Sequence, residues 1–122
     1  MKEFKLRVES PNAFSSRLID AGRRIDAGDY AVAEFGYSFH SAEALFALLT
    51  PNRWRLLSAL RQHGAWSIRA LGKALGRDYK AVHTDVTALI EAGLIERDEK
   101  SLISVPWTKI SAELLDSEAE AA

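Results

Sequence analysis

The sequence predicts a mainly α-helical α+β fold for this chain of 122 residues. Three observations support this class. Between residues 50 and 93, apolar residues recur at helical spacing in three stretches that capping residues and glycines delimit. After Gly93 the spacing changes to that of a short hairpin, and residues 4–8 alternate like a strand. A chain of this length buries roughly two thirds of its unfolded surface, so we expect one globular domain.

The first 49 residues predict an extension made of strands and helices. Apolar residues alternate over residues 4–8, and helical spacing follows over residues 14–25. Residues 30–39, YAVAEFGYSF, predict a second strand, and Ser41 precedes a short helix, AEALFALL. The extension is rich in aromatic and apolar residues, namely Phe14, Leu18, Ile25, Tyr30, Phe35, Tyr37 and Phe39. We expect a dimer or partner interface here, and the alternative is an extension that packs only on its own domain.

Three helices are predicted next, and capping residues mark their starts. Thr50 followed by Pro51 is typical of an N-cap and a first helical turn. Ser67 caps a second, shorter helix, and Asp78 caps the third. The glycines that end them are Gly64, Gly76 and Gly93. The expected inward-facing residues are Trp54, Leu57, Ala59 and Leu60, then Ile68, Leu71, Ala74 and Leu75, then Val82, Val86 and Leu89.

The segment after the third helix predicts a hairpin and then a last helix. Apolar residues at 94–95 and 102–105 lie on either side of a polar centre at residues 98–101, and Pro106 ends this pattern. Residues 108–122 predict an amphipathic helix followed by an acidic tail. The apolar residues of that helix are Ile110, Leu114 and Leu115.

Three helices with a tight turn between the second and third, followed by a hairpin, form a winged helix-turn-helix. We therefore predict an N-terminal strand and helix extension at 1–49, a winged helix-turn-helix domain at 50–107, and a C-terminal helix with its tail at 108–122. The hairpin is the predicted wing. Trp66 and Trp107 are expected to close the small core, with stacking on single-stranded nucleic acid as the alternative.

The net charge of −1 results from two opposed regions. Between residues 53 and 80, seven basic residues stand against one acid, Asp78, whereas acids predominate from Glu91 onward. The basic residues are Arg53, Arg55, Arg61, Arg69, Lys73, Arg77 and Lys80. This asymmetry indicates an anionic partner at the basic region, although solvated helix faces would give the same pattern.

The polar face of the third predicted helix indicates that the anionic partner is DNA. At roughly 100° per residue, Lys80, Thr84 and Thr87 lie opposite the apolar stripe, with His83 beside them. Lysine bonds guanine acceptors or a phosphate, threonine bonds a base edge or packs its methyl on thymine, and histidine donates or accepts. Tyr79 suits a phosphate or sugar contact, and the helix N-terminus favours a phosphate. The alternative is a face that is merely solvated.

Residues 49–99 resemble the prokaryotic winged-helix regulators of the MarR and ArsR type, in which the ending V-x-x-x-V-x-x-L-x-x-x-G-L-I-E-R is characteristic. The resemblance covers Leu49 to Trp107. More narrowly, SFHSAEALFALLTPNRWRLLSAL, GRDYKAVHTDV and VPW resemble a small family of predicted transcriptional regulators that are commonly antitoxins of type II toxin-antitoxin modules. The resemblance implies DNA binding as a dimer, neutralisation of a toxin, and autorepression.

The resemblance also implies a recognition helix over Asp78–Ala92. The implied DNA-binding residues are Arg77, Tyr79, Lys80, His83, Thr84 and Thr87 for the recognition helix, Ser67, Arg69 and Lys73 for phosphates at the second helix, and Arg97 and Lys100 for the wing. Carboxylates at Asp98 and Glu99 would repel phosphates near the wing. Asp85 has three interpretations: an ion pair with a neighbouring arginine, acceptance from a cytosine amine, or an outward-facing position.

Other chemistries have no support in the sequence. The absence of cysteine excludes disulfides, thiolate catalysis and cysteine-ligated zinc, and it indicates a reducing compartment. His40, His63 and His83 lack metal-ligand spacing, and neither a phosphate-binding glycine loop nor a G-x-S-x-G elbow is present. We therefore expect no enzyme, cofactor or metal. No apolar run approaches roughly 18 residues, and MKEFKLRVES lacks the core of a secretory signal, so we expect a cytoplasmic protein without a membrane partner.

The sequence favours a repressor that binds double-stranded DNA in a sequence-specific way as a homodimer. The resemblance adds the role of an autorepressing antitoxin with a cognate toxin as partner. One alternative is a winged-helix adaptor for protein interactions, and another is a regulator that responds to a small molecule in a pocket between the extension and the three helices. Salt dependence separates the first two hypotheses, because only DNA binding through phosphates falls steeply with salt.

Overall fold

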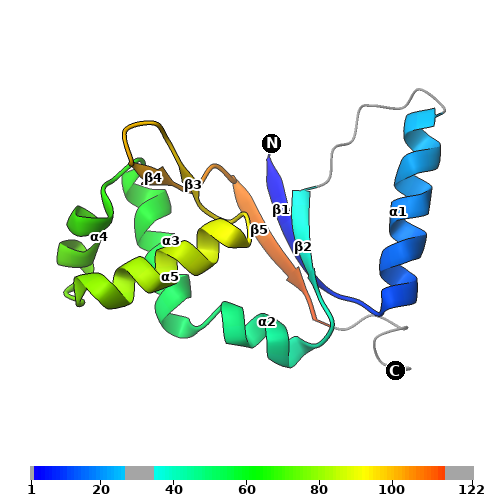
Figure 1. Cartoon of the computed structure of the whole chain (residues 1–122), viewed down its shortest axis with the longest axis horizontal. Helices are drawn as coiled ribbons and strands as arrows, with labels where there is room; N and C mark the ends of the chain where they lie inside the picture. Colours follow the sequence, from blue (N-terminus) through cyan, green and yellow to red (C-terminus); the bar gives the residue numbers. More distant parts are fainter. Residues whose placement is uncertain (1, 27–34, 115–122) are drawn as a thin grey trace. The chain divides into compact units, whose positions relative to one another are not determined.

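The computed structural model describes residues 2–26 and 35–114, and it shows the expected mixture of helices and small sheets (Figure 1). In chain order the elements are β1 (Glu3–Val8), α1 (Pro11–Asp26), β2 (Phe35–Phe39), α2 (Ala42–Leu48), α3 (Pro51–His63), α4 (Ile68–Leu75), α5 (Tyr79–Glu91), β3 (Glu96–Arg97), β4 (Ile103–Ser104) and β5 (Lys109–Glu113). The chain divides into two compact units. Unit one contains residues 46–108 with Lys2, and unit two contains residues 3–45 and the chain from residue 109 onward.

Unit one begins with three helices whose starts are capped as predicted. The hydroxyl of Thr50 accepts from the backbone N–H of Arg53 at 3.2 Å at the start of α3. Ser67 caps α4 and Asp78 caps α5 in the same way, through the N–H groups three residues on. The turn between α4 and α5 uses Gly76 in the left-handed region, at φ 66°, where a residue with a Cβ is strained.

The predicted hairpin is present as β3 and β4, which pair antiparallel with Arg97 opposite Ile103. The carboxylate of Asp98 organises its turn, because Oδ1 accepts from the backbone N–H groups of Lys100 at 2.8 Å and Leu102 at 3.0 Å. Trp66 extends this small sheet through two backbone hydrogen bonds to Ile103, at 2.8 and 2.9 Å. The hairpin is therefore attached to the segment that precedes α4.

The core of unit one comes from all three helices and the hairpin. Its fully buried residues are Leu56, Leu57, Leu60, Leu71, Val82, Val86, Leu89, Leu94, Ile95 and Ile103. Trp107 is buried as expected, and its indole N–H donates to the carbonyl of Gly93 at 3.1 Å. The expected inward position of Trp54 is wrong, since 47% of this residue is exposed. The buried stripe of α3 is centred on Leu56, Leu57 and Leu60, and Trp54 lies roughly 100° around the helix from that centre.

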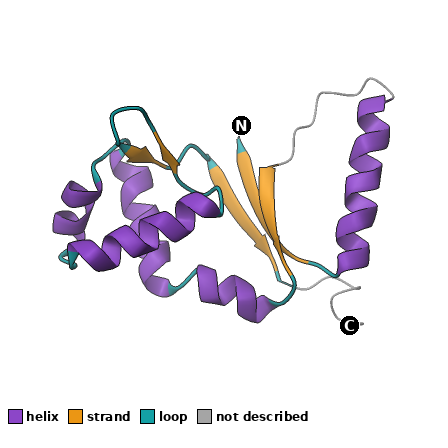
Figure 2. Ribbon diagram, viewed as in Figure 1, coloured by secondary structure: helices purple, strands orange, loops and turns teal. Residues whose placement is uncertain are grey.

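Unit two contains a three-stranded parallel sheet in the order β2-β1-β5 (Figure 2). The predicted strands at residues 4–8 and 30–39 are confirmed as β1 and β2, although residues 30–34, with Tyr30, lie outside the described residues. The predicted helix over residues 14–25 is confirmed as α1, which follows β1. Phe4, Leu6 and Val8 are buried on one face of the central strand, and Lys5 and Arg7 lie on the other.

The predicted C-terminal helix is wrong over Lys109–Glu113. These residues form β5, which pairs parallel with β1 and places Ala112 beside Leu6. Lysine, alanine and glutamate favour helices weakly, but a partner strand supplies ladder hydrogen bonds that override this local preference. Ile110 and Ala112 also alternate with polar residues, a pattern that fits a strand as well as a helix. Leu115 and the acidic tail lie outside the described residues.

Among the helices of residues 2–26 and 35–114, none has the length and apolar character needed to cross a membrane.

Candidate nucleic-acid interface

Helix α5 has one buried face and one polar face, divided as the sequence predicts. Val82, Val86 and Leu89 are fully buried against the rest of unit one. On the opposite side, Lys80 and Thr84 are exposed, as are the neighbouring side chains of His83 and Thr87. The buried stripe anchors the helix by roughly 1.5–3 kcal/mol for each large apolar side chain, so the polar face is held in a fixed orientation.

The two threonines of this face are locked by their own helix. The hydroxyl of Thr84 donates to the carbonyl of Lys80 at 3.0 Å, and that of Thr87 donates to the carbonyl of His83 at 2.9 Å. Each hydroxyl proton is therefore engaged one turn back. What remains for a ligand is a methyl group and the hydroxyl oxygen as an acceptor.

An aromatic and cationic cluster stands at the start of α5. The guanidinium carbon of Arg69, on α4, lies 4.8 Å from the centre of the Tyr79 ring, and the rings of Tyr79 and His83 are 5.9 Å apart. Tyr79 is 42% exposed, and Arg69 and His83 are exposed too. The ring of Tyr79 attracts the guanidinium of Arg69 and restricts its position. A positive charge is thereby held beside the N-terminus of α5, where a phosphate is also favoured.

Asp85 binds two arginines and turns away from the polar face. Its Oδ1 accepts from Arg53 Nε at 2.9 Å, and its Oδ2 lies 2.8 Å from Arg77 Nη2 in an ion pair. Arg53 Nη1 also donates to the carbonyl of Leu48 at 2.8 Å. Of the three interpretations of Asp85, the structure shows the ion pair with arginine. Arg77, expected among the groove-facing residues, is thus held by a carboxylate within unit one, with 24% of its side chain exposed.

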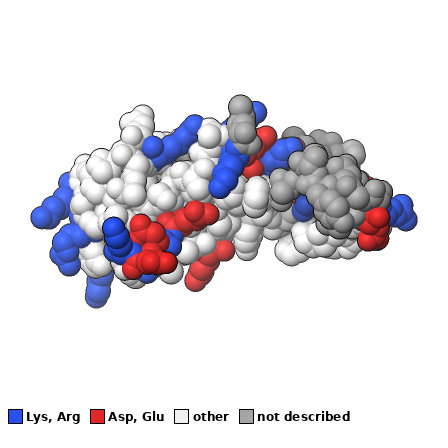
Figure 3. Space-filling model, turned by 90° about the horizontal axis from the view of Figure 1, so that it is seen from above, with Lys and Arg blue, Asp and Glu red and all other residues white. Residues whose placement is uncertain are grey.

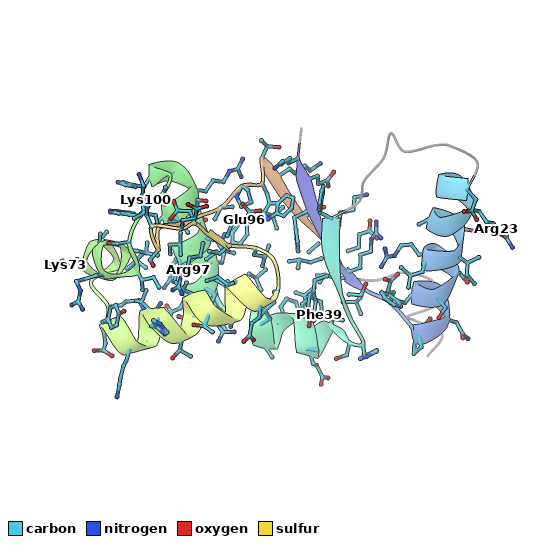
Figure 4. The ribbon with its side chains drawn as sticks, turned by 45° about the horizontal axis from the view of Figure 1, so that its top comes forward. Arg23, Phe39, Lys73, Glu96, Arg97 and Lys100 are labelled. Carbon is cyan, nitrogen blue, oxygen red and sulfur yellow. The ribbon has the colours of Figure 1, made fainter. Side chains whose placement is uncertain are left out.

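The residues expected at phosphates lie around α4. Ser67 uses its hydroxyl as the N-cap, accepting from the N–H of Ala70 at 3.1 Å, and its own proton stays available for a further bond. Lys73 is exposed in the last turn of α4 and is labelled on that helix in Figure 4. In Figure 3, Lys and Arg side chains gather at the left-hand end of the view, where α4 and α5 lie in Figure 1.

The hairpin carries both signs of charge. Arg97, on β3, and Lys100, in the turn, are exposed, and Figure 4 labels them near Glu96. Asp98 points one carboxylate oxygen at the backbone of its own turn, so part of its charge is neutralised by N–H groups. Glu99 is exposed in the same turn. The hairpin is therefore a weaker site for phosphates than the start of α5.

The three histidines are dispersed over separate segments. His40 follows β2, His63 ends α3, and His83 lies on α5. The ring of His63 stacks on Trp66, with 3.5 Å between the ring centres. Within residues 2–26 and 35–114, no group of three or more His, Asp or Glu residues is arranged to hold a metal ion.

The sequence model of the family HVO_A0114 matches residues 48–112, more than half of the chain. The chain belongs to the HVO_A0114 family. No curated protein and no solved structure matches it. Within the HVO_A0114 match lie α3, α4, α5, the hairpin and nearly all of β5. Every residue expected to bind DNA, from Ser67 to Lys100, lies inside it as well. The name of the family states no activity.

The sequence did not identify two contacts of this HVO_A0114 chain in full, although an arginine partner was one of the three interpretations of Asp85. The stacking of Arg69 on Tyr79 joins residues ten positions apart on different helices. The bridge of Asp85 to both Arg53 and Arg77 joins three segments of unit one. A signal for the bridge exists in the sequence, because Asp85 directly precedes the buried Val86 and therefore lies at the edge of the buried stripe.

Proposed function

We propose that this chain is a sequence-specific regulator of transcription that binds double-stranded DNA through unit one. Helices α3, α4 and α5 with the β3–β4 hairpin form a winged helix-turn-helix in this proposal. The observation that carries it is the polar face of α5, on which Lys80, His83, Thr84 and Thr87 are exposed while the opposite face is fully buried. Such a helix presents hydrogen-bonding side chains on a rigid support, as reading of a major groove requires.

The affinity in this proposal comes from phosphate contacts around the start of α5. Arg69 is held there by Tyr79, Lys73 is exposed on α4, and the N-cap residue Ser67 retains a donor. Cations of this kind neutralise phosphates and release counterions, so binding should weaken steeply as salt rises. Arg77 contributes to the fold through Asp85, and we assign it no phosphate.

The sequence preference comes from Lys80, Thr84 and Thr87. Lys80 supplies a charged donor for the acceptor atoms of guanine or for a phosphate. The threonines supply methyl groups and acceptors, since their protons are engaged by the helix. These groups match the methyl of thymine or the amines of adenine and cytosine.

The motifs shared with antitoxin-like regulators extend the proposal to an autorepressing antitoxin that acts as a homodimer with a toxin partner. A dimer suits a DNA reader because two half-sites lie about one helical turn apart. Unit two offers apolar surface for such contacts, on both α1 and β2. The exposed large apolar residues of these two elements are Phe14, Leu18, Ile19, Phe35 and Tyr37.

A titration of duplex DNA tests the proposal. The duplex is taken from upstream of the gene, a scrambled duplex serves as control, and binding is measured by fluorescence anisotropy at low and high salt. We expect tighter, salt-sensitive binding to the upstream duplex. The double variant Lys80→Ala, Thr84→Ala should bind at least about tenfold more weakly, because each good base contact contributes about 1–3 kcal/mol.

The matched control is Lys109→Ala, which removes the same charge from an exposed position in unit two. It should bind the upstream duplex like the unchanged chain. Circular dichroism and a melting curve show that each variant is folded. Equal affinity for the upstream and scrambled duplexes, or normal binding by the double variant, would contradict the assignment of the α5 face.

An adaptor for protein partners is the second candidate. The observations that favour it are the exposed apolar residues Phe46 and Trp54 in unit one and the acidic side chains of the hairpin. An adaptor would show little affinity for duplex DNA at either salt concentration. The same titration therefore separates the two candidates.

A further inference from the structure

Unit two contains a small polar cavity beside the sheet. Its volume is about 70 Å³. The residues that line it come from β1, β2 and α1, and they are Lys5, Arg7, Arg17, Phe35, Gly36, Tyr37 and Ser38. Three of these residues are basic and none is acidic.

One of the three cations is neutralised by a buried carboxylate. Glu9 is only 7% exposed, and its Oε1 accepts from Arg17 Nη2 at 2.8 Å and from the hydroxyl of Ser38 at 2.5 Å. Arg17 Nη2 also donates to Ser38 Oγ at 3.1 Å. The ring of Phe14 lies 5.3 Å from the guanidinium carbon of Arg17. Arg17 is therefore fixed in one orientation at the wall of the cavity.

A second cation also stands next to a carboxylate. In the sheet register Arg7 pairs with Glu113, so the two side chains lie on the same face of adjacent strands. Lys5, by contrast, has no ion pair within residues 2–26 and 35–114, and it is only partly exposed. Its neighbour in the register on β2 is Gly36, which brings no side chain. Among the described residues, one positive charge at the cavity thus has no carboxylate in an ion pair with it.

Unused hydrogen-bond donors also favour an anion at this cavity. Arg17 bonds its partners through Nε and Nη2, so the two N–H groups of Nη1 stay available in the described part of the chain. Gly36 is required at this place, since a Cβ there would lie 2.3 Å from the carbonyl oxygen of Lys5. At Gly36 the cavity wall is consequently backbone, and the adjacent ammonium and guanidinium groups are suited to a compact anion.

We propose that this cavity binds an oxyanion of the size of phosphate, held by Lys5 and Arg17. Lys5 supplies the uncompensated charge, and the planar guanidinium of Arg17 supplies directed hydrogen bonds. The phosphate belongs either to a small metabolite or to the backbone of a nucleic acid. This inference is independent of the reading of bases by α5.

Calorimetric titration of the full chain with inorganic phosphate tests the proposal, with chloride at matched ionic strength as the reference. We expect saturable binding of phosphate at one site. Lys5→Met, which keeps the aliphatic stem, should weaken it at least about tenfold, as loss of a charge-assisted contact does. The matched control is Lys109→Met, which removes a lysine from the opposite edge strand of the same sheet, on the same face.

The absence of phosphate binding by the unchanged chain would overturn the proposal. An equal loss of phosphate affinity in Lys5→Met and Lys109→Met would overturn it too, because that result indicates a general effect of surface charge and no specific site. Anisotropy with the duplex then identifies the source of the phosphate. Weaker duplex binding by Lys5→Met, with competition by inorganic phosphate, assigns the site to the nucleic-acid backbone, and unchanged duplex binding assigns it to a free phosphate compound.

Discussion

Thr84 and Thr87 illustrate how a single hydrogen bond determines what a side chain offers to a partner. Their hydroxyl protons are engaged by carbonyls of α5, so the outward-facing groups are methyls and oxygen lone pairs. A threonine in this state favours thymine methyls and amine donors over guanine acceptors. The base preference of the proposed reader therefore depends on the helix as much as on the residue type.

Substitution of Thr84 by valine and by serine separates the methyl from the hydroxyl. Thr84→Val keeps the methyl, and we expect its affinity for the upstream duplex to stay within about 0.5 kcal/mol of the unchanged chain. Thr84→Ser keeps the hydroxyl and should lose about 1 kcal/mol, the contribution of one buried methyl. Anisotropy titrations of both variants measure this difference. If Thr84→Ser binds the duplex more tightly than Thr84→Val, the hydroxyl bonds the base.

Glu9 makes unit two sensitive to acid. Burial raises the pKa of Glu9, but the hydrogen bonds from Arg17 and Ser38 and the charges of Arg17 and Arg7 outweigh it, so the pKa in the folded chain lies below the ordinary 4.5. The unfolded chain then takes up the proton first as the pH falls. The stability that Glu9 contributes is complete above pH 4.5 and is lost as the pH falls through the lower, folded pKa.

Urea unfolding, from neutral pH down to about pH 3, measures this loss. In Glu9→Gln the unfolding free energy should be lower at neutral pH and should depend less on pH in the acid range. Glu91→Gln serves as the control, because Glu91 is exposed at the end of α5. If Glu9→Gln and the unchanged chain lose stability in parallel, the carboxylate does not carry this dependence.

At the scale of elements, replacement of two glycines by alanine should have opposite effects on stability. Gly76 ends α4 at φ 66°, where a Cβ is strained, whereas Gly22 lies inside α1 with no atom within 4 Å of a Cβ built on it. Gly76→Ala should therefore destabilise unit one by about 1–2 kcal/mol. Gly22→Ala should stabilise α1 by about 0.5–1 kcal/mol, because alanine is the better helix former. Melting curves of the two variants should shift in opposite directions.

Capping residues explain why the helices of unit one are predictable from the sequence. Thr50, Ser67 and Asp78 act on N–H groups three residues away, so the evidence for each helix start is local. Strand β5 is different, since its partner β1 is at the other end of the chain. Local spacing at Lys109–Glu113 fits a helix or a strand, and only the pairing decides between them.

In the candidate site, too, the sequence predicts what local spacing determines and does not predict contacts between distant segments. The exposed face of α5 follows from helical periodicity, and Lys80, Thr84 and Thr87 lie where that periodicity predicts. The engagement of Asp85 by Arg53 depends on the position of α3, which no local pattern supplies. The charged cavity of unit two was missed for a similar reason, because its residues come from three separate elements.

At the scale of the whole molecule, the two units differ in how the chain builds them. Unit one, apart from Lys2, is one continuous segment, whereas unit two is assembled from both sides of that segment. The proposed DNA reader is therefore inserted in sequence between β2 and β5. The HVO_A0114 match follows unit one and continues into β5, so the shared segment includes a strand of the second unit.

The pairing of β1 with β5 has a consequence for synthesis on the ribosome. The hydroxyl of Ser111 donates to the carboxylate of Glu3, which lies 108 positions earlier in the chain. The chain is made from its N-terminus, so β1 emerges early and lacks this neighbour until the last described strand has been made. Until β5 is translated, one edge of β1 exposes unpaired backbone groups of the kind that promote aggregation. A chain truncated before β5 would therefore carry an open sheet edge along β1, which is a suitable substrate for chaperones and proteases.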